Sequence, residues 1–204
     1  MKTLIVLPTY NEADNIVEAL RRAREAAPEA DALVVDDGSP DGTADIAEKW
    51  GAEHGGVQVL RREAKSGLGS AYKAGFALGL DQGYDVLVEM DSDLQHDPAV
   101  LPALIHPIAD GAELVIGSRY VQGGGAPNRE ASRQLLSRAG NVYAALVLGL
   151  KVRDVSSGYR AYSAEGLRRI DLSKIEADGF GFQIEMVYHL APAGARCACA
   201  VACA

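Results

Sequence analysis

The body of the sequence has no cysteine: Cys197, Cys199 and Cys203 are its three cysteines, and all follow residue 196. Such a chain has no disulfide framework, which predicts a protein of a reducing, cytoplasmic compartment. The spacing of the three thiols could suit a soft metal, but the surrounding ARCACAVACA has low complexity and no histidine. We therefore expect no metal site there.

Long apolar runs are also missing. None approaches the roughly 18 residues of a membrane-spanning helix, and the longest candidate is AALVLGL at 144–150. We expect a core helix there, and a helix lying on a membrane surface is the alternative. The opening Met1-Lys2-Thr3 leads directly into LIVLP, without the apolar region and cleavage site of a signal peptide.

Basic residues are in the minority. The chain has 20 Lys and Arg against 28 Asp and Glu, which gives a formal net charge of −8. This balance argues against a nucleic-acid partner. Hydrophobic residues make up 48% of the 204 residues and charged residues 24%, which is the composition of one globular domain with a sizeable core.

Apolar, β-branched segments alternate with helical segments. We expect strands at 3–8, 32–39, 57–61, 85–91 and 113–119, and helices capped by Asn11 and at 45–54, 67–80, 98–110, 132–150 and within 179–190. Alternation with short connections predicts an α/β fold whose mostly parallel sheet is covered by helices on both faces. In such sheets the functional residues lie beyond the carboxyl ends of the strands.

One strand of this pattern ends in an acidic cluster, VLVEMDSDLQHD at 86–97. On extended backbone, Asp91 and Asp93 would point the same way and would repel each other unless a cation bridges them. Oxygen ligands without thiolates favour Mg²⁺ or Mn²⁺. An acidic turn before the next helix is the alternative, although Asp97 alone can supply that cap. The pattern indicates no role for Glu89.

Two further segments suggest a nucleotide. In VVDDGSPDG (34–42), Asp37 or Asp36 could accept hydrogen bonds from a base or ribose, and a plain turn is the alternative. KSGLGSAYKAG (65–75) places glycines and Lys65 before a helix, as a phosphate loop does. It lacks the ending of a P-loop, and Tyr72 replaces the third glycine of a dinucleotide fingerprint.

Arginines supply the opposite charge later in the chain. Arg119, Arg133 and Arg138 are candidates for contacts with a phosphate, although a solvated helix face explains Arg138 better. Together with the acidic strand ends, they indicate a nucleoside-diphosphate donor and a charged acceptor.

Several motifs occur in an order that resembles a known family: PTYNE (8–12), DDGSPDGT (36–43), KSGLGSAYKAG (65–75), MDSDLQHDP (90–98), GSRY (117–120), SRAGN (137–141) and SGYR (157–160). Together they resemble the family-2 glycosyltransferases of the GT-A fold and, within them, the polyprenol (dolichol) phosphate mannose synthases. The resemblance spans about residues 3–190.

This resemblance implies an inverting enzyme that moves mannose from GDP-mannose to polyprenyl phosphate with Mg²⁺ or Mn²⁺. It also implies a peripheral protein on the cytoplasmic face of a membrane, with a possible membrane-anchoring subunit. The alternatives are UDP-glucose or another nucleotide sugar as donor, and a chain that binds nucleotide without turnover. A sugar-1-phosphate nucleotidyltransferase would have a glycine-rich signature where this chain has PTYNE.

The resemblance and the glycine-rich loop assign site residues. Those for the donor nucleotide are Pro8, Tyr10, Glu12, Val35, Asp37, Lys65, Asp91, Ser92, Asp93, Gln95 and Arg119. Among them, Asp91, Asp93 and Gln95 are the expected metal ligands, and Asp93 and Arg119 the expected catalytic residues. Arg133 and Ser137 match residues that receive the acceptor phosphate.

The sequence departs from the family after Leu190. Members continue with a strand and a basic loop of the type D-R-x-x-G-x-S-K, whereas this chain reads APAGARCACAVACA. We expect a catalytic domain at 1–190, followed by an atypical low-complexity tail at 191–204. We expect no protein general base, because a phosphate monoester with a second pKa of about 6 is already largely anionic at neutral pH.

Overall fold

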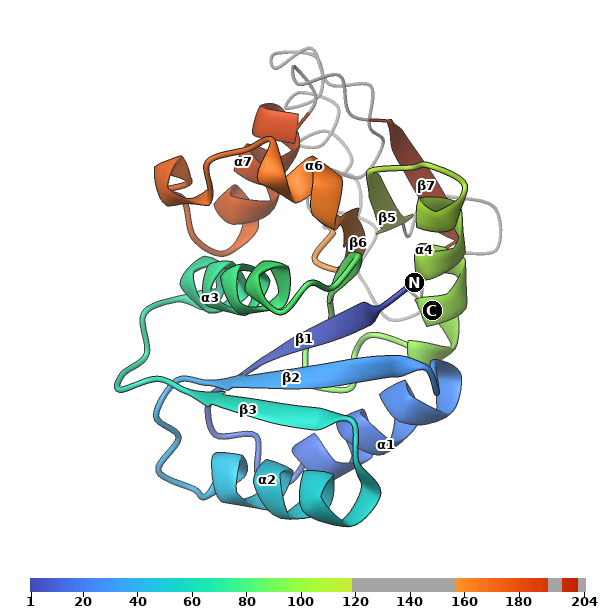
Figure 1. Cartoon of the computed structure of the whole chain (residues 1–204). Coiled ribbons are helices and arrows are strands. Elements are labelled where there is room, and N and C mark those ends of the chain that lie inside the picture. Colours follow the sequence, from blue (N-terminus) through green and yellow to red (C-terminus); the bar gives the residue numbers. More distant parts are fainter. Residues whose placement is uncertain (119–156, 191–195, 202–204) are drawn as a thin grey trace, which may run out of the picture.

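The computed structural model describes residues 1–118, 157–190 and 196–201 (Figure 1). Its strands are β1 (Thr3–Thr9), β2 (Ala30–Asp36), β3 (Val57–Arg61), β4 (Val86–Glu89), β5 (Leu114–Ser118), β6 (Arg160–Ser163) and β7 (Cys197–Val201). Its α-helices are α1 (Ile16–Ala26), α2 (Thr43–His54), α3 (Leu68–Asp81), α4 (Leu101–Ala109), α6 (Ala164–Arg168) and α7 (Phe180–Leu190). Short 3₁₀ turns, η1 (Pro98–Val100) and η2 (Leu172–Lys174), precede α4 and follow α6.

The strands form one seven-stranded sheet in the order β3-β2-β1-β4-β6-β5-β7. All neighbours are parallel except β6, which runs antiparallel to both β4 and β5. The expected mostly parallel sheet is therefore confirmed. Residues 197–201, within the low-complexity tail, add the edge strand β7 beside β5.

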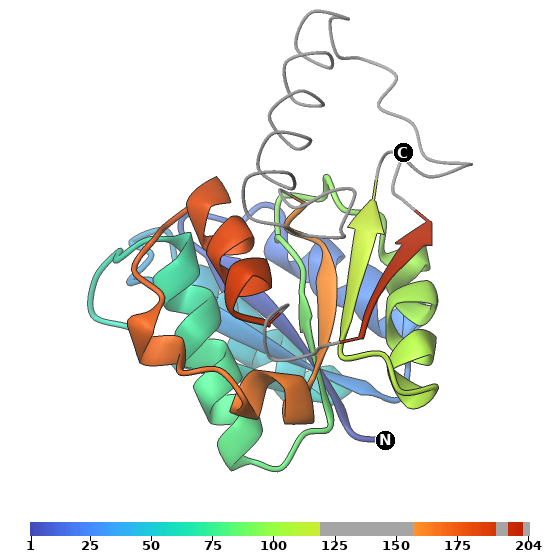
Figure 2. The ribbon, with the colours of Figure 1, turned by 90° about the horizontal axis from the view of Figure 1, so that it is seen from above.

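Helices cover both faces of the sheet, as Figures 1 and 2 show. On one face, buried residues of α3, α6 and α7 pack against the strands, including Phe76, Leu167 and Met186. On the other face, α1, α2 and α4 contribute residues such as Leu20 and Leu104. Within the described ranges, no helix combines the length and the apolar character needed to cross a membrane.

The first helix begins later than expected. It starts at Ile16 with Asn15 as its N-cap, so the expectation that Asn11 caps it is wrong. Asn11 instead has a left-handed φ of 61°, a conformation in which Asn is enriched. Side chains after β2 hold this segment, because Thr43 Oγ1 accepts from the Glu12 N–H and Asp41 Oδ2 from the Ala13 N–H, both at 3.0 Å. The segment after β1 is thus a fixed loop.

Helix α3 lies close to the sheet because glycines face it. A Cβ at Gly75 would lie 2.5 Å from Val6 Cγ1, and one at Gly79 would lie 2.7 Å from Leu87 Cδ2. The early turns of α3 reach the loop after β4, where the Tyr72 hydroxyl donates to Asp91 Oδ1.

We expect Gly75→Ala to lower the free energy of unfolding by about 1–2 kcal/mol, because overpacking a core costs more than the gain in helix propensity. Urea denaturation measures this change. Ala77→Gly, at an exposed position of the same helix, reports helix propensity alone. A Gly75→Ala variant as stable as the original chain would contradict the close packing.

Candidate active site at the carboxyl edge of the sheet

Hydrogen bonds tie together the loops that follow β1, β2 and β4. The Asp37 N–H donates to the Thr9 carbonyl at 3.0 Å, and Ser92 Oγ donates to the Pro8 carbonyl at 3.0 Å. Because these strands are parallel, the motifs PTYNE, DDGS and DSD all lie at one edge of the sheet. Ser92, which is 3% exposed, therefore links the loop after β4 to the end of β1.

The two neighbouring aspartates after β2 have different roles. Asp36 accepts hydrogen bonds from Thr9 Oγ1 at 3.0 Å and from the backbone and hydroxyl of Ser39 at 2.9 and 2.6 Å, so its role is structural. Asp37 forms an ion pair with Arg62 at 3.1 Å and accepts from the Ser66 N–H at 3.2 Å. Asp37 thus connects the β2 end to the loop that carries Lys65.

Tyr10 and Lys65 meet at the rim of this edge. The Lys65 Nζ lies 4.4 Å from the centre of the Tyr10 ring, a cation–π geometry, and Tyr10 as a residue is 38% exposed. Glu12, in the same loop as Tyr10, accepts a hydrogen bond from Asn15 Nδ2 at 2.8 Å. The structure therefore brings Tyr10 and Lys65 together on an accessible surface.

The Val35 side chain lies elsewhere. It is fully buried in the core beneath α3, so only the backbone of Val35 is left for the base contact that the resemblance implied, and that contact stays a prediction. Its register partner on β1 is Pro8, which is also buried. The reason is the sheet itself: both residues lie inside central strands that are covered on both faces.

The glycine-rich loop before α3 does not present a free helix N-terminus. Asp178 Oδ1 accepts a hydrogen bond from the Gly69 N–H at 2.7 Å, and the Asp178 carboxylate fills the space beside Gly67. Lys73 Nζ donates to the Ile175 carbonyl at 2.6 Å and holds the same segment. An internal carboxylate thus takes the position where a phosphate loop would bind its ligand, and the expectation for this helix end is wrong.

The acidic loop after β4 contains Asp91 and Asp93. The strand ends at Glu89, so the argument from strand alternation does not apply to the two aspartates. Asp91 is partly buried: its Oδ1 accepts from the Tyr72 hydroxyl at 2.8 Å, and its N–H donates to His96 Nδ1 at 3.1 Å. Asp93 is exposed, and its Oδ1 accepts from the Gln95 N–H at 3.0 Å.

This loop can contribute two carboxylates to a divalent ion. Within residues 1–118, 157–190 and 196–201, no group of three or more His, Cys, Asp or Glu side chains is arranged to hold a metal. A pair of carboxylates nevertheless fits Mg²⁺ or Mn²⁺, which take oxygen ligands and leave positions for water and substrate phosphates. Gln95 is exposed in the same loop. Asp97 caps η1 by accepting from the Ala99 N–H at 3.0 Å, as expected.

The SGYR segment (157–160) packs against the acidic loop through Tyr159. The Tyr159 ring stacks on His96, with ring centres 4.7 Å apart and planes at 6°. Ser157 Oγ donates to the Gly117 carbonyl at 2.6 Å and so anchors the segment to β5. This stacking holds His96, and through His96 the backbone of Asp91.

Sequence reasoning missed a buried polar network behind the site. Glu89 and Arg160 face each other across β4 and β6, and both are fully buried. Glu89 Oε2 accepts from Gln183 Nε2 at 2.7 Å, and Arg160 donates to the Gln183 carbonyl at 2.8 Å. Burial raises the pKa of Glu89 to about 7, while Arg160 and Gln183 favour its ionised form. The sequence feature that could have indicated this network is the single Glu89 inside the apolar run VLVEM (86–90).

Several expected residues lie outside the described part of the chain. These are Arg119, Arg133 and Ser137, together with Arg138 and the run at 144–150. Their roles stay predictions.

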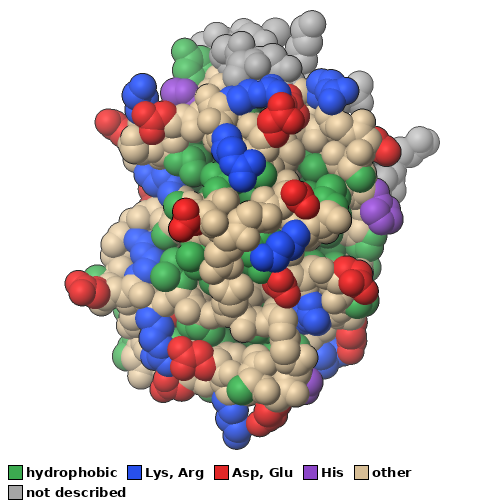
Figure 3. Space-filling view, in the orientation of Figure 1, with side chains coloured by type: hydrophobic (Ala, Val, Ile, Leu, Met, Phe, Trp, Pro, Cys, Tyr) green, Lys and Arg blue, Asp and Glu red, His purple; other side chains and the backbone are tan. Residues whose placement is uncertain are grey.

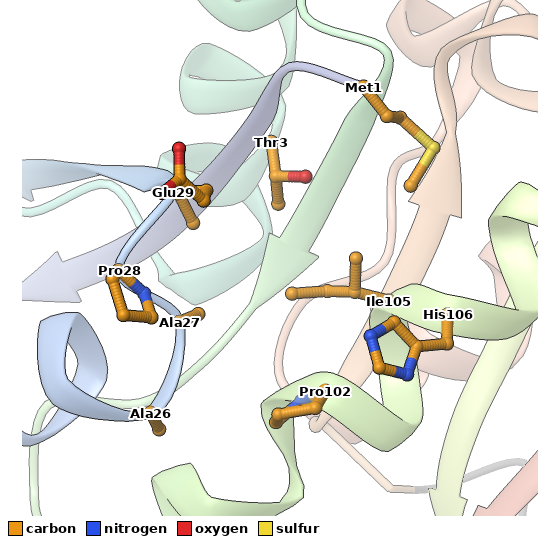
Figure 4. A pocket seen from close by; sticks show the side chains of 10 residues that line it. Met1, Thr3, Ala26, Ala27, Pro28, Glu29, Pro102, Ile105 and His106 are labelled. Carbon is orange, nitrogen blue, oxygen red and sulfur yellow. The ribbon is translucent and has the colours of Figure 1, made fainter.

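A cavity of about 230 Å³ occurs at the opposite end of the sheet (Figure 4). Thr3 and Ala30, which begin β1 and β2, line it together with Ile105 and His106 of α4. It therefore lies at the amino ends of the parallel strands, away from the acidic loop.

On the face seen in Figure 3, Lys and Arg side chains are interspersed with Asp and Glu.

The sequence model described as Glycosyl transferase family 2 matches residues 4–171. The chain belongs to glycosyl transferase family 2. Two relatives are similar over most of its length. The undecaprenyl-phosphate mannosyltransferase of Micrococcus luteus is 51% identical over 96% of this chain and 80% of that protein. The polyprenol monophosphomannose synthase of Mycolicibacterium smegmatis is 46% identical over 92% of this chain and 71% of that protein.

Solved structures of other glycosyltransferases share the fold of this family-2 chain. A Mycobacterium tuberculosis glucosyl-3-phosphoglycerate synthase, solved with Mn²⁺, UDP and glucosyl-3-phosphoglycerate, has a TM-score of 0.69 at 24% identity. The match covers 97% of this chain and 68% of the synthase chain. A Pyrobaculum calidifontis mannosyltransferase with GDP-Man and Mn²⁺ has a TM-score of 0.70 at 19% identity. This match covers 98% of this chain and 55% of the mannosyltransferase chain. At these identities the likeness establishes the fold alone.

Proposed function

We propose that this family-2 glycosyltransferase moves mannose from GDP-mannose to a polyprenyl phosphate, with inversion at the anomeric carbon. The observation that carries the proposal is the meeting of Asp37, the Tyr10–Lys65 pair and the Asp91–Asp93 loop at one edge of the sheet. The names of the relatives at 51% and 46% identity support the sugar and the lipid acceptor.

In this mechanism a phosphate oxygen of the acceptor attacks the anomeric carbon, on the face opposite the nucleotide. The bond from that carbon to the diphosphate oxygen breaks, and its electron pair leaves with GDP. A divalent ion held by Asp91 and Asp93 would stabilise the negative charge that develops on the leaving diphosphate. The protein has no proton to remove from the acceptor, because that phosphate is already largely anionic at neutral pH.

The residues of this chain supply positioning and charge. Asp91 is preset by its hydrogen bonds to Tyr72 and His96, and exposed Asp93 completes the carboxylate pair. Lys65, over the Tyr10 ring, adds a positive charge where the diphosphate would lie. Asp37 is the proposed contact of the base, at a position fixed by Arg62. Holding donor and acceptor in line lowers the barrier further, because it converts the encounter of two substrates into a reaction within one complex.

Further assignments belong to this proposal. Gln95 is a third metal-side ligand, Arg119 contacts the donor diphosphate, and Arg133 and Ser137 receive the acceptor phosphate. The metal is Mg²⁺ or Mn²⁺. A lipid acceptor places the enzyme peripherally at the cytoplasmic face of a membrane, where a separate membrane-anchoring subunit is a possible partner.

A comparison of nucleotides tests the donor. We expect GDP with Mn²⁺ to raise the melting temperature of the purified protein more than UDP with Mn²⁺ does. GDP-mannose should then give labelled lipid with polyprenyl phosphate, while UDP-glucose should not. Preference for UDP would assign another donor. Binding of GDP without any transfer would mean a nucleotide-binding chain and would contradict the proposed function.

A further inference from the structure

We propose that Tyr72 is a positioning residue: it holds one oxygen of Asp91 so that the other oxygen is available to the metal–diphosphate. This inference rests on the proposed function, because it concerns the same acidic loop. Nothing in the glycine-rich motif of Tyr72 indicates this role, since Tyr72 is 19 positions away from Asp91 in the sequence.

The Tyr72 hydroxyl has a well-defined place. Tyr72 is fully buried in the first turns of α3, and its ring stacks on Phe182 of α7, with centres 6.2 Å apart and planes at 7°. Phe76 packs on the ring as well, at 6.0 Å. Because the aromatic neighbours fix the ring, the hydroxyl can serve as a rigid donor to Asp91 Oδ1 at 2.8 Å.

Helix α3 is itself fastened near Tyr72. Asp178 binds the Gly69 N–H one turn earlier, and a Cβ at Gly69 would lie 2.8 Å from the Phe182 ring. Figure 2 shows α7 alongside α3. Asp178 and Phe182 thus hold the first turn of α3 in place. They thereby fix the position of Tyr72 relative to the end of β4.

This contact distinguishes the two oxygens of Asp91. Oδ1 is taken by Tyr72, whereas Oδ2 lies 3.8 Å from His96 Nε2, beyond hydrogen-bond distance. Asp91 keeps 34% of its side chain exposed, so Oδ2 is the oxygen available to a cation. Tyr72 thus sets the direction in which this carboxylate points.

Two effects of the Tyr72 hydroxyl oppose each other. Its hydrogen bond withdraws negative charge from the carboxylate and so weakens the attraction to a cation. It also fixes the carboxylate, which sits on a loop rather than on a strand, and so removes the entropy cost of orienting the ligand. Loss of such outer hydrogen bonds typically lowers metal affinity by roughly 10–100-fold, so the orienting effect is the larger one.

Tyr72→Phe removes one oxygen and keeps the aromatic packing. We expect the affinity for Mn²⁺, measured by electron paramagnetic resonance with GDP present, to fall by about tenfold. GDP binding without metal should stay unchanged. In the transfer assay the apparent KM for Mn²⁺ should rise by a similar factor, while kcat at saturating Mn²⁺ stays within about twofold, a split that a loss of folded protein would not produce.

Tyr84→Phe is the matched control. Tyr84 is also buried, and its hydroxyl donates to Asp31 Oδ2 at 2.6 Å, but it lies at the amino end of β4. This variant should bind Mn²⁺ as the original chain does. If Tyr72→Phe has a lower melting temperature than Tyr84→Phe, its Mn²⁺ affinity is measured at a temperature below its unfolding transition. Binding of GDP without metal then shows that the site is folded.

The outcomes separate the two proposals. Mn²⁺ affinity unchanged or tighter in Tyr72→Phe, with normal binding in the original chain, overturns the role of Tyr72 alone. An original chain that binds no Mn²⁺ in the presence of GDP contradicts the proposed function and this inference with it.

Discussion

Asp93→Ala is expected to lower mannose transfer by roughly 10³-fold, since a metal that stabilises a leaving group contributes several kcal/mol and each 1.36 kcal/mol changes the rate tenfold. Asp93 is exposed and accepts a hydrogen bond from the backbone of its own loop, the Gln95 N–H. Its removal should therefore leave the melting temperature nearly unchanged. Initial rates of lipid-linked mannose formation, at fixed Mn²⁺ and GDP-mannose, measure the effect.

Asp97→Asn provides the matched control four residues further on. Asp97 caps η1 through the Ala99 N–H, and asparagine is an equally good cap. We expect this variant to keep its activity. If Asp93→Ala transferred mannose at the original rate, this result would contradict the role of Asp93 as a metal ligand.

Arg160→Leu is expected to destabilise the protein by about 3–5 kcal/mol, because it removes the buried donors to the Ser157 and Gln183 carbonyls and leaves both acceptors unsatisfied. Arg160 is fully buried and faces Glu89 across the strands. For a chain of this size the loss corresponds to a fall in melting temperature of roughly 10 °C. Arg21→Leu, at an exposed surface pair, should have little effect. An Arg160→Leu variant with unchanged stability would show that this network does not hold β6 and α7 together.

The pH dependence of stability offers a second readout of the same network. Burial raises the pKa of Glu89 from 4.5 to about 7, so the folded state binds more protons than the unfolded state between these values. Its contribution to stability is present below pH 4.5 and is lost as the pH rises through about 7. Urea unfolding at pH 5 and pH 8 should show this loss in the original chain and not in Glu89→Gln. In Arg160→Leu the loss should extend to higher pH, because Arg160 favours the ionised form.

Local patterns in the sequence predicted the fold and part of the site. Alternating strand and helix signals place the motifs at the carboxyl edge of the sheet, and Asp97 is recognisable as a cap because it precedes Pro98. The family, too, followed from the order of its motifs, and the match over residues 4–171 confirms it.

Contacts between distant segments could not be predicted in this way. Glu89 meets Arg160 through the register of an antiparallel pair that forms between distant strands. Asp178 reaches the α3 N-terminus across 109 positions and changes the role of a loop that, by its glycines, resembles a phosphate site. In the sequence Tyr72 only replaces a glycine of a dinucleotide motif, whereas in the fold its hydroxyl donates to Asp91 Oδ1.

The most direct test of the central claim is the transfer reaction itself. Purified protein is mixed with labelled GDP-mannose, polyprenyl phosphate and Mn²⁺ or Mg²⁺, and label is counted in the extracted lipid. The account predicts metal-dependent transfer of mannose with release of one GDP for each lipid formed, and its loss on chelation. Protein that binds GDP and metal but leaves the lipid unlabelled would contradict it.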